Sequence, residues 1–255
     1  GDVYKRQEDG GPGTASIVID HVCNDGRVIE AASGVEFVDI CGGSDTIGCT
    51  PGISSCDPDE TPTMDVTLTR DFYVSRTEIT QAQYQSVMGS NPSHFDECGD
   101  DCPVDSISWN MAAAFSNALS AAAGLTECYA CGGPGPCTVT APLYACEGYR
   151  LLTGAEWEIA ARCGTEERFA GDAIAARVAW YTGNSGDRTR SVATKQRNAC
   201  GLYDMSGNVA EWVHNWYAEY STVPVVDPSL SVGATSDDVR ATRGGSWAGT
   251  TDSLR

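Results

Sequence analysis

The chain has 255 residues, of which 41% are apolar, so it can bury one sizeable hydrophobic core. Its formal net charge is −19, from 35 acidic and 16 basic side chains. Such a charge repels polyphosphate and anionic membrane surfaces, so nucleic acid is not expected as a partner. No run of about eighteen apolar residues occurs, and we therefore expect no membrane span.

The N-terminal stretch differs from the rest of the chain. Residues 1–7 include DVYKRQ, which resembles a translated sequencing adapter, and we interpret them as an artefact. The stretch up to residue 33 is rich in Gly and Asp, which is typical of a linker or the remnant of a preceding region. We place one domain at residues 34–255. We expect it to be truncated at its C-terminal end, because the chain stops soon after a strong motif.

Two segments carry strand patterns, and a loop separates them. Residues 34–40 alternate apolar and polar side chains, which predicts a strand. Residues 41–62 form a loop rich in Cys, Gly and Pro, and residues 64–80 then predict a strand or a hairpin. After Gly164 the periodicity is weak, which indicates long irregular loops.

Three helices have recognisable start signals. Capping boxes at Thr80/Gln83 and Thr153/Glu156 predict two helix N-termini. A third helix is predicted within residues 109–124, ending at a glycine. Its expected apolar face consists of Met111, Phe115, Ala118, Leu119 and Ala122.

Cysteine is the most unusual component of the sequence. The chain has twelve, an even number, and many lie in Gly-, Pro- and Asp-rich loops. Such loops gain stability from covalent closure, so we predict up to six disulfides and an extracytoplasmic location. A zinc site remains the alternative, because four cysteines are close in sequence: Cys128, Cys131, Cys137 and Cys146.

Histidine offers no support for a catalytic or zinc site. The three histidines, His21, His94 and His214, lie in separate segments without helical or hairpin spacing. We therefore name no catalytic residue.

Five motifs, in order, resemble the formylglycine-generating, or sulfatase-modifying-factor, domain family. They are RDFYVSRTEITQAQYQSVMGSNPSHF (70–95), CPVDSISWNMAAAFSNALS (102–120), GYRLLTGAEWEIAARCG (148–164), GLYDMSGNVAEWVHNWY (201–217) and RGGSW (243–247). The resemblance implies an α+β, C-type-lectin-like fold with little regular secondary structure. A twisted antiparallel sheet, two to three helices and long disulfide-linked loops are expected.

The same resemblance implies a structural calcium ion. The matching ligands are the side chains of Asp204 and Glu211 and the backbone carbonyls of Gly207 and Val209. Calcium binds several oxygens in flexible geometry, and this loop supplies two carboxylates around a glycine turn. The alternative is that Asp204 caps a turn and Glu211 forms an ion pair.

The resemblance does not extend to the cysteine pair of the family's catalytic centre. Family enzymes oxidise a substrate cysteine with a copper(I)-binding cysteine pair, at the third and eighth residues after the serine of RGGS. Here those positions hold Gly249 and Leu254, and neither can ligate copper. An aromatic residue of the family pattern is Ala210 in this chain. Copper is therefore not expected, and Cys200 is expected to pair with Cys163.

Around RGGSW the resemblance leaves three candidates for a ligand groove: Arg243, Ser246 and Trp247. The alternative is a core strand with Trp247 buried. The resulting prediction is a binding or structural module for an unknown protein or glycan ligand. The competing hypothesis is an oxidoreductase that converts a substrate cysteine to formylglycine.

Overall fold

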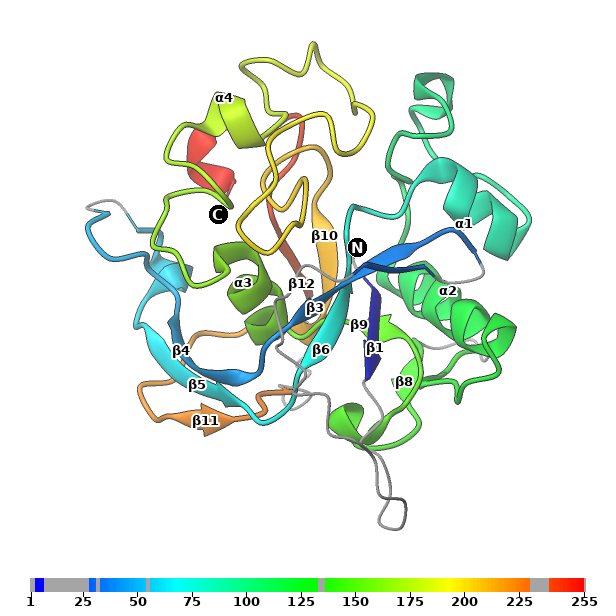
Figure 1. The fold of residues 1–255 in the computed structure, drawn as a ribbon, viewed down its shortest axis with the longest axis horizontal. Helices are drawn as coiled ribbons and strands as arrows, with labels where there is room; N and C mark the ends of the chain where they lie inside the picture. The colour runs from blue at the N-terminus through cyan, green and yellow to red at the C-terminus, as the bar shows by residue number, and fades with distance from the viewer. Residues whose placement is uncertain are drawn as a thin grey trace.

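A five-stranded antiparallel sheet crosses the middle of the molecule, in the order β2-β3-β6-β1-β9 (Figure 1). The computed structural model describes residues 3–6, 28–30, 33–53, 56–132, 136–229 and 239–254. The strands of this sheet are β1 (Val3–Arg6), β2 (Val28–Glu30), β3 (Glu36–Ile40), β6 (Phe72–Ser75) and β9 (Arg150–Leu151).

Three smaller sheets surround it. One joins β4 (Gly43–Ile47) and β11 (Val225–Val226) to the two edges of β5 (Met64–Leu68), antiparallel and parallel respectively. The others pair β7 (Tyr129–Ala130) with β8 (Thr138–Val139), and β10 (Glu211–Trp216) with β12 (Arg240–Arg243). The strand predicted within residues 34–40 is confirmed. For residues 64–80 a strand or a hairpin is predicted: strands are present, as β5 and β6, but they form no hairpin because they belong to different sheets.

The helices are α1 (Gln81–Met88), α2 (Trp109–Ala122), α3 (Gly154–Arg162) and the short α4 (Ala175–Val178). Both predicted capping boxes are present. The Thr80 hydroxyl accepts the Gln83 N–H at 3.2 Å, while the Gln83 side chain accepts the Thr80 N–H at 2.9 Å. Thr153 and Glu156 make the equivalent pair of bonds. These local signals therefore placed two helix starts correctly.

The buried face of α2 differs from the prediction. Phe115 and Leu119 are buried as expected, but Ala122 is exposed. The helix instead buries polar side chains, because these have hydrogen-bond partners. Asn117 exchanges hydrogen bonds with the backbone of Tyr129, and Ser120 accepts the Tyr149 N–H at 2.8 Å. Buried polar groups satisfied in this way cost little, so apolarity alone does not identify the packed face.

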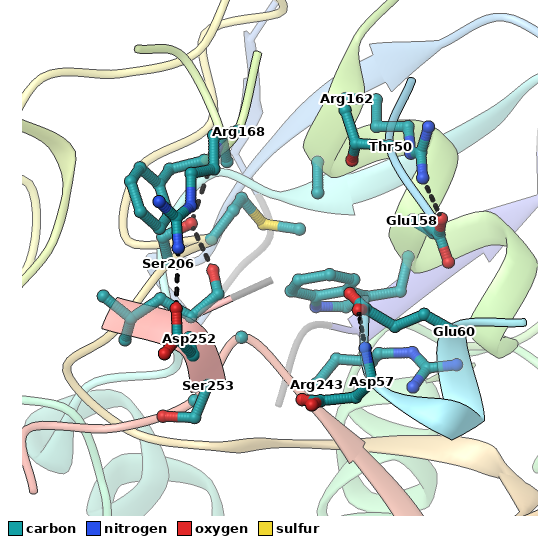
Figure 2. A pocket seen from close by; sticks show the side chains of 18 of the residues that line it. Thr50, Asp57, Glu60, Glu158, Arg162, Arg168, Ser206, Arg243, Asp252 and Ser253 are labelled. Carbon is teal, nitrogen blue, oxygen red and sulfur yellow. Dashed lines mark hydrogen bonds and ion pairs between the residues drawn. The ribbon is translucent and has the colours of Figure 1, made fainter. Parts of the chain in front are cut away.

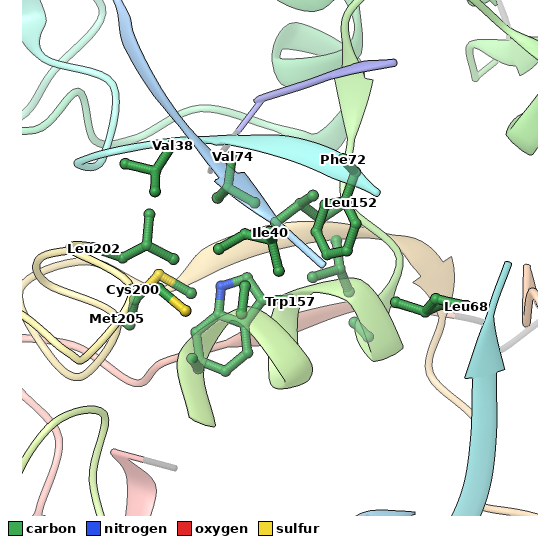
Figure 3. Close-up of a cluster of buried hydrophobic side chains, with 14 residues drawn as sticks. Val38, Ile40, Leu68, Phe72, Val74, Leu152, Trp157, Cys200, Leu202 and Met205 are labelled. Atoms are coloured by element: carbon green, nitrogen blue, oxygen red, sulfur yellow. The ribbon is translucent and has the colours of Figure 1, made fainter. Parts of the chain in front are cut away.

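The main core lies between the central sheet and α3 (Figure 3). Val38 and Ile40 of β3 and Phe72 of β6 pack over Trp157 of α3. Leu202 and other residues of the segment after α4 join this cluster. Residues 179–210 contain no helix or strand, so the long loop drawn in yellow in Figure 1 is held by packing, hydrogen bonds and the disulfide at Cys200.

Disulfides close the loops, and the zinc alternative is wrong. The pairs are Cys49–Cys56, Cys98–Cys102, Cys128–Cys146, Cys131–Cys137 and Cys163–Cys200. Cys41 is also disulfide-bonded, and no cysteine among the described residues is free. All four thiols of the zinc hypothesis are consumed in this way, whereas the expected Cys163–Cys200 pair is confirmed. Cys23 and His21 lie outside the described residues.

Strands β1 and β2 come from the N-terminal segment that we expected to be an artefact, a linker or a remnant. Most of that segment lies outside the described residues, and the boundary at residue 34 stays a prediction. In the described part of the chain, no helix has the length and apolarity needed to cross a bilayer.

Candidate functional site

The loop from Asp204 to Glu211 leads into β10, and all of its residues except Ala210 are buried. Asp204 and Glu211 are 2% and 1% exposed. One carboxylate oxygen of Asp204 accepts the Ala193 N–H at 2.7 Å, and one oxygen of Glu211 accepts the Trp157 indole N–H at 2.8 Å. The second oxygen of each, Oδ1 of Asp204 and Oε1 of Glu211, has no hydrogen-bond partner.

These two oxygens are suited to a cation. Burial, opposed by the hydrogen bond from Ala193 and reinforced by the charge of Glu211, raises the pKa of Asp204 to about 6. A buried carboxylate oxygen without a donor is costly, and a bound calcium ion would satisfy it. Gly207 and Val209, the expected carbonyl ligands, lie on the same loop. No three His, Cys, Asp or Glu side chains of the described chain form a metal site by themselves, so backbone oxygens would have to complete the ligand set.

A third carboxylate, Glu78, supports this loop, and the sequence reasoning missed it. Its Oε1 accepts the Val209 N–H at 2.9 Å and its Oε2 accepts the Asn208 side-chain amide at 2.7 Å. Burial, followed by the charges of Asp204 and Glu211, raises the pKa of Glu78 well above its usual value. Both carboxylate oxygens of Glu78 accept hydrogen bonds from the loop, so Glu78 holds the loop in its conformation.

The loop is also joined to the RGGSW segment. The Gly207 N–H donates to the Gly244 carbonyl at 2.7 Å, and the Trp247 N–H donates to the Asn208 carbonyl at 2.8 Å. Gly207 has φ +85°, and a Cβ there would lie 2.3 Å from the Trp180 carbonyl oxygen. Only glycine fits so close a backbone crossing. The two strongest motifs of the sequence therefore form one structural unit.

RGGSW is not a core strand, so that interpretation is wrong. Strand β12 ends at Arg243, because Gly244 and Gly245 both have positive φ, +83° and +69°. A Cβ at Gly245 would lie 2.1 Å from the Ser253 carbonyl oxygen. Trp247 is half-buried beyond this turn, with its ring edge-on to Phe95 at 5.2 Å between centroids.

The structure divides the three groove candidates between two cavities. Arg243 lines a cavity of about 360 Å³, in which ion pairs Arg162–Glu158 and Arg168–Asp252 are each 2.6 Å long (Figure 2). Ser246 and Trp247 line a separate hollow of about 320 Å³. We call this hollow the aromatic groove, defined by His94, Phe95, Asp105, Trp212, Ser246 and Trp247.

Gly249 and Leu254 lie beyond the same turn. Leu254 is fully buried in an apolar cluster with Phe169 and Val178. Gly249 is held by backbone bonds, since its N–H donates to the Ser246 carbonyl and its carbonyl accepts the Thr182 N–H. Ala210 is exposed and borders both cavities. No thiol lies at these positions, so they do not fit copper(I).

Fold and site together define a disulfide-rich α+β domain, with long ordered loops, in which a carboxylate loop is joined to a glycine turn. The chain belongs to the family described as the sulfatase-modifying factor enzyme 1-like domain, whose family model matches residues 28–255. The fold class and the family expected from the sequence are thereby confirmed.

Known proteins of several kinds resemble the chain. The chaperone protein LppX of Paenibacillus barcinonensis is 34% identical over 184 residues, covering 60% of this chain and 65% of that protein. The formylglycine-generating enzyme of Streptomyces coelicolor is 35% identical over 117 residues, covering 39% of this chain and 36% of that protein. The matches thus span less than two thirds of these relatives. The solved structure of Treponema denticola variable protein 1 has a TM-score of 0.73 and 31% identity, covering 89% of this chain and 90% of that one.

Proposed function

We propose that this domain is an extracytoplasmic, non-catalytic binding module that presents the aromatic groove on a calcium-stabilised scaffold. The observation that carries the proposal is the environment of Gly249 and Leu254. Copper(I) requires soft ligands such as thiolates. At the two positions where the resemblance expects them, the chain has a glycine and a leucine that is 0% exposed.

The cysteines elsewhere in the described chain also argue against a copper site. The disulfides within the described residues leave none of their cysteines free to bind a metal. The abundance of disulfides also supports an oxidising compartment, since such bonds persist outside the reducing cytosol. A groove with aromatic walls, by contrast, is a common feature of surfaces that bind ligands.

Copper(I) titration under anaerobic conditions tests the proposal directly. We expect no stoichiometric copper binding, and no oxygen consumption with a cysteine-containing peptide. The Streptomyces coelicolor formylglycine-generating enzyme, assayed in parallel, is the positive control. Stoichiometric copper with turnover would overturn the proposal and establish the oxidoreductase alternative.

A further inference from the structure

The walls of the aromatic groove are held by contacts within the protein. His94 and Phe95 meet edge to face at 4.8 Å, and Phe95 meets Trp247 in the same way at 5.2 Å. The Trp212 indole N–H donates to the Ile107 carbonyl at 3.0 Å, which holds another aromatic ring of the lining in place. Preorganised aromatic faces bind a ligand without the entropy cost of ordering them.

One carboxylate of the groove is used to build it. Asp105 accepts the backbone N–H groups of His94 at 2.8 Å and Phe95 at 3.2 Å, one on each carboxylate oxygen. Its negative charge nevertheless stays at the groove, beside the aromatic rings. The groove therefore offers a ligand aromatic rings and a negative charge.

Four further carboxylates lie on the loop that directly follows Phe95, itself a wall residue of the groove. This acidic rim consists of Asp96, Glu97, Asp100 and Asp101. All four are exposed, and none forms an ion pair with another described residue. The Cys98–Cys102 disulfide closes the part of this loop that carries Asp100 and Asp101, and Asp96 and Glu97 directly precede Cys98.

Basic side chains near the rim are few. The segment that packs against it, donating the Val192 N–H to the Asp101 carbonyl, carries Arg188 and Arg190. The guanidinium of Arg190 lies over the Trp180 ring at 5.5 Å. Arg188 is exposed on that segment, so the carboxylates of the groove and rim remain in excess.

We propose that the aromatic groove binds a lysine or arginine side chain of a basic peptide segment. This inference rests on the proposed binding function and names its ligand class. A cation gains from the face of a tryptophan or phenylalanine ring, and partial desolvation in a groove strengthens the interaction. The acidic rim, together with a net charge of −19, attracts a basic partner and accelerates the encounter.

Three short peptides of equal length test the proposal in the whole chain: one rich in lysine, its acetyl-lysine counterpart and its glutamate counterpart. Binding is measured by calorimetry at low and high salt. We expect the lysine peptide to bind and the other two to bind at least about tenfold more weakly. Trp247→Ala should weaken lysine-peptide binding by at least about tenfold at both salt concentrations, because the aromatic contact is lost.

The rim has its own variant and a matched control. Asp96→Asn with Glu97→Gln should weaken binding severalfold at low salt and little at high salt, since exposed charges are screened. Glu147→Gln with Glu166→Gln removes the same charge from exposed positions outside the groove and should have a much smaller effect. Circular dichroism confirms that each variant is folded, and the rim variant needs no buried change.

The outcomes distinguish failure of the basic-peptide proposal from failure of the proposed binding function. Equal binding of the acetylated peptide, or equal loss in the rim and control variants, would overturn the basic-peptide proposal. If a neutral peptide or a glycan then bound with dependence on Trp247, the binding module would stand with another ligand class. Copper binding with turnover would overturn the proposal that the domain is a non-catalytic binding module.

Discussion

Asp204 has a carboxylate that the protein buries while leaving one of its oxygens without a donor, and Glu211 shares this condition. Two such carboxylates in one buried loop repel each other when the loop is empty. A divalent cation would convert that repulsion into attraction. The calcium prediction therefore concerns the stability of the domain. Stability can be measured without knowing the ligand of the groove.

Asp204→Asn should abolish calcium-dependent stability. With calcium at about 100 times its Kd, we expect the wild type to gain about 2.7 kcal/mol and melt about 5 °C or more above its chelated form. The variant should show no such difference, although its amide oxygen can still accept the Ala193 N–H.

Asp187→Asn is the matched control, because Asp187 has the same positive φ of 58° but is exposed. Differential scanning fluorimetry in calcium and in chelator compares the three proteins. An equal melting temperature of the wild type in calcium and in chelator would show that the loop binds no calcium ion.

The loop around Gly207 shows how an irregular element can be as constrained as a helix. Its backbone crosses Trp180 and Gly244 through hydrogen bonds of 2.8 and 2.7 Å, the first donated by Asn208. Gly207→Ala should destabilise the domain by about 3 kcal/mol or more, because the new Cβ meets the Trp180 carbonyl and the backbone cannot retreat.

Gly89→Ala provides the comparison for backbone strain alone. Gly89 ends α1 with φ +76°, and a Cβ added at this position would meet no atom within 4 Å. We expect a cost of about 1 kcal/mol from the left-handed conformation. Urea unfolding of both variants measures the difference, and equal losses would mean that the Trp180 contact contributes nothing.

Prediction from the sequence succeeded where the physical cause was local. Thr80 and Thr153 begin helices because each capping box lies within four residues. Partners distant in sequence were not predictable: Glu78 reaches Asn208 across 130 residues, and its only sequence signal is a charge before a helix. The division of Arg243 from Trp247 depends on two positive-φ glycines whose turn direction no periodicity encodes.

For the molecule as a whole, the disulfides differ in how much chain they restrain. Cys163–Cys200 spans 37 residues and joins the end of α3 to the irregular loop, whereas Cys98–Cys102 spans 4. Loop-closure entropy predicts losses of about 4 and about 2 kcal/mol when each pair is replaced by alanine. Guanidinium unfolding of the two double variants tests this order.

The reverse order would mean that the short bridge does more than close its own loop. Because the Cys98–Cys102 loop carries two rim residues, Asp100 and Asp101, its double variant should also be compared with the wild type in lysine-peptide binding. A stable variant with weakened binding would assign that bridge to the groove.

The bond between Glu78 and Asn208 has a consequence for synthesis on the ribosome. At about 5–20 residues per second, translation needs roughly 7 to 26 seconds to pass from one to the other. Throughout that interval the Glu78 carboxylate has no Asn208 or Val209 to bind, so it must stay hydrated. The N-terminal half therefore cannot complete its own packing around this residue until the segment that carries Asn208 and Val209 has left the tunnel.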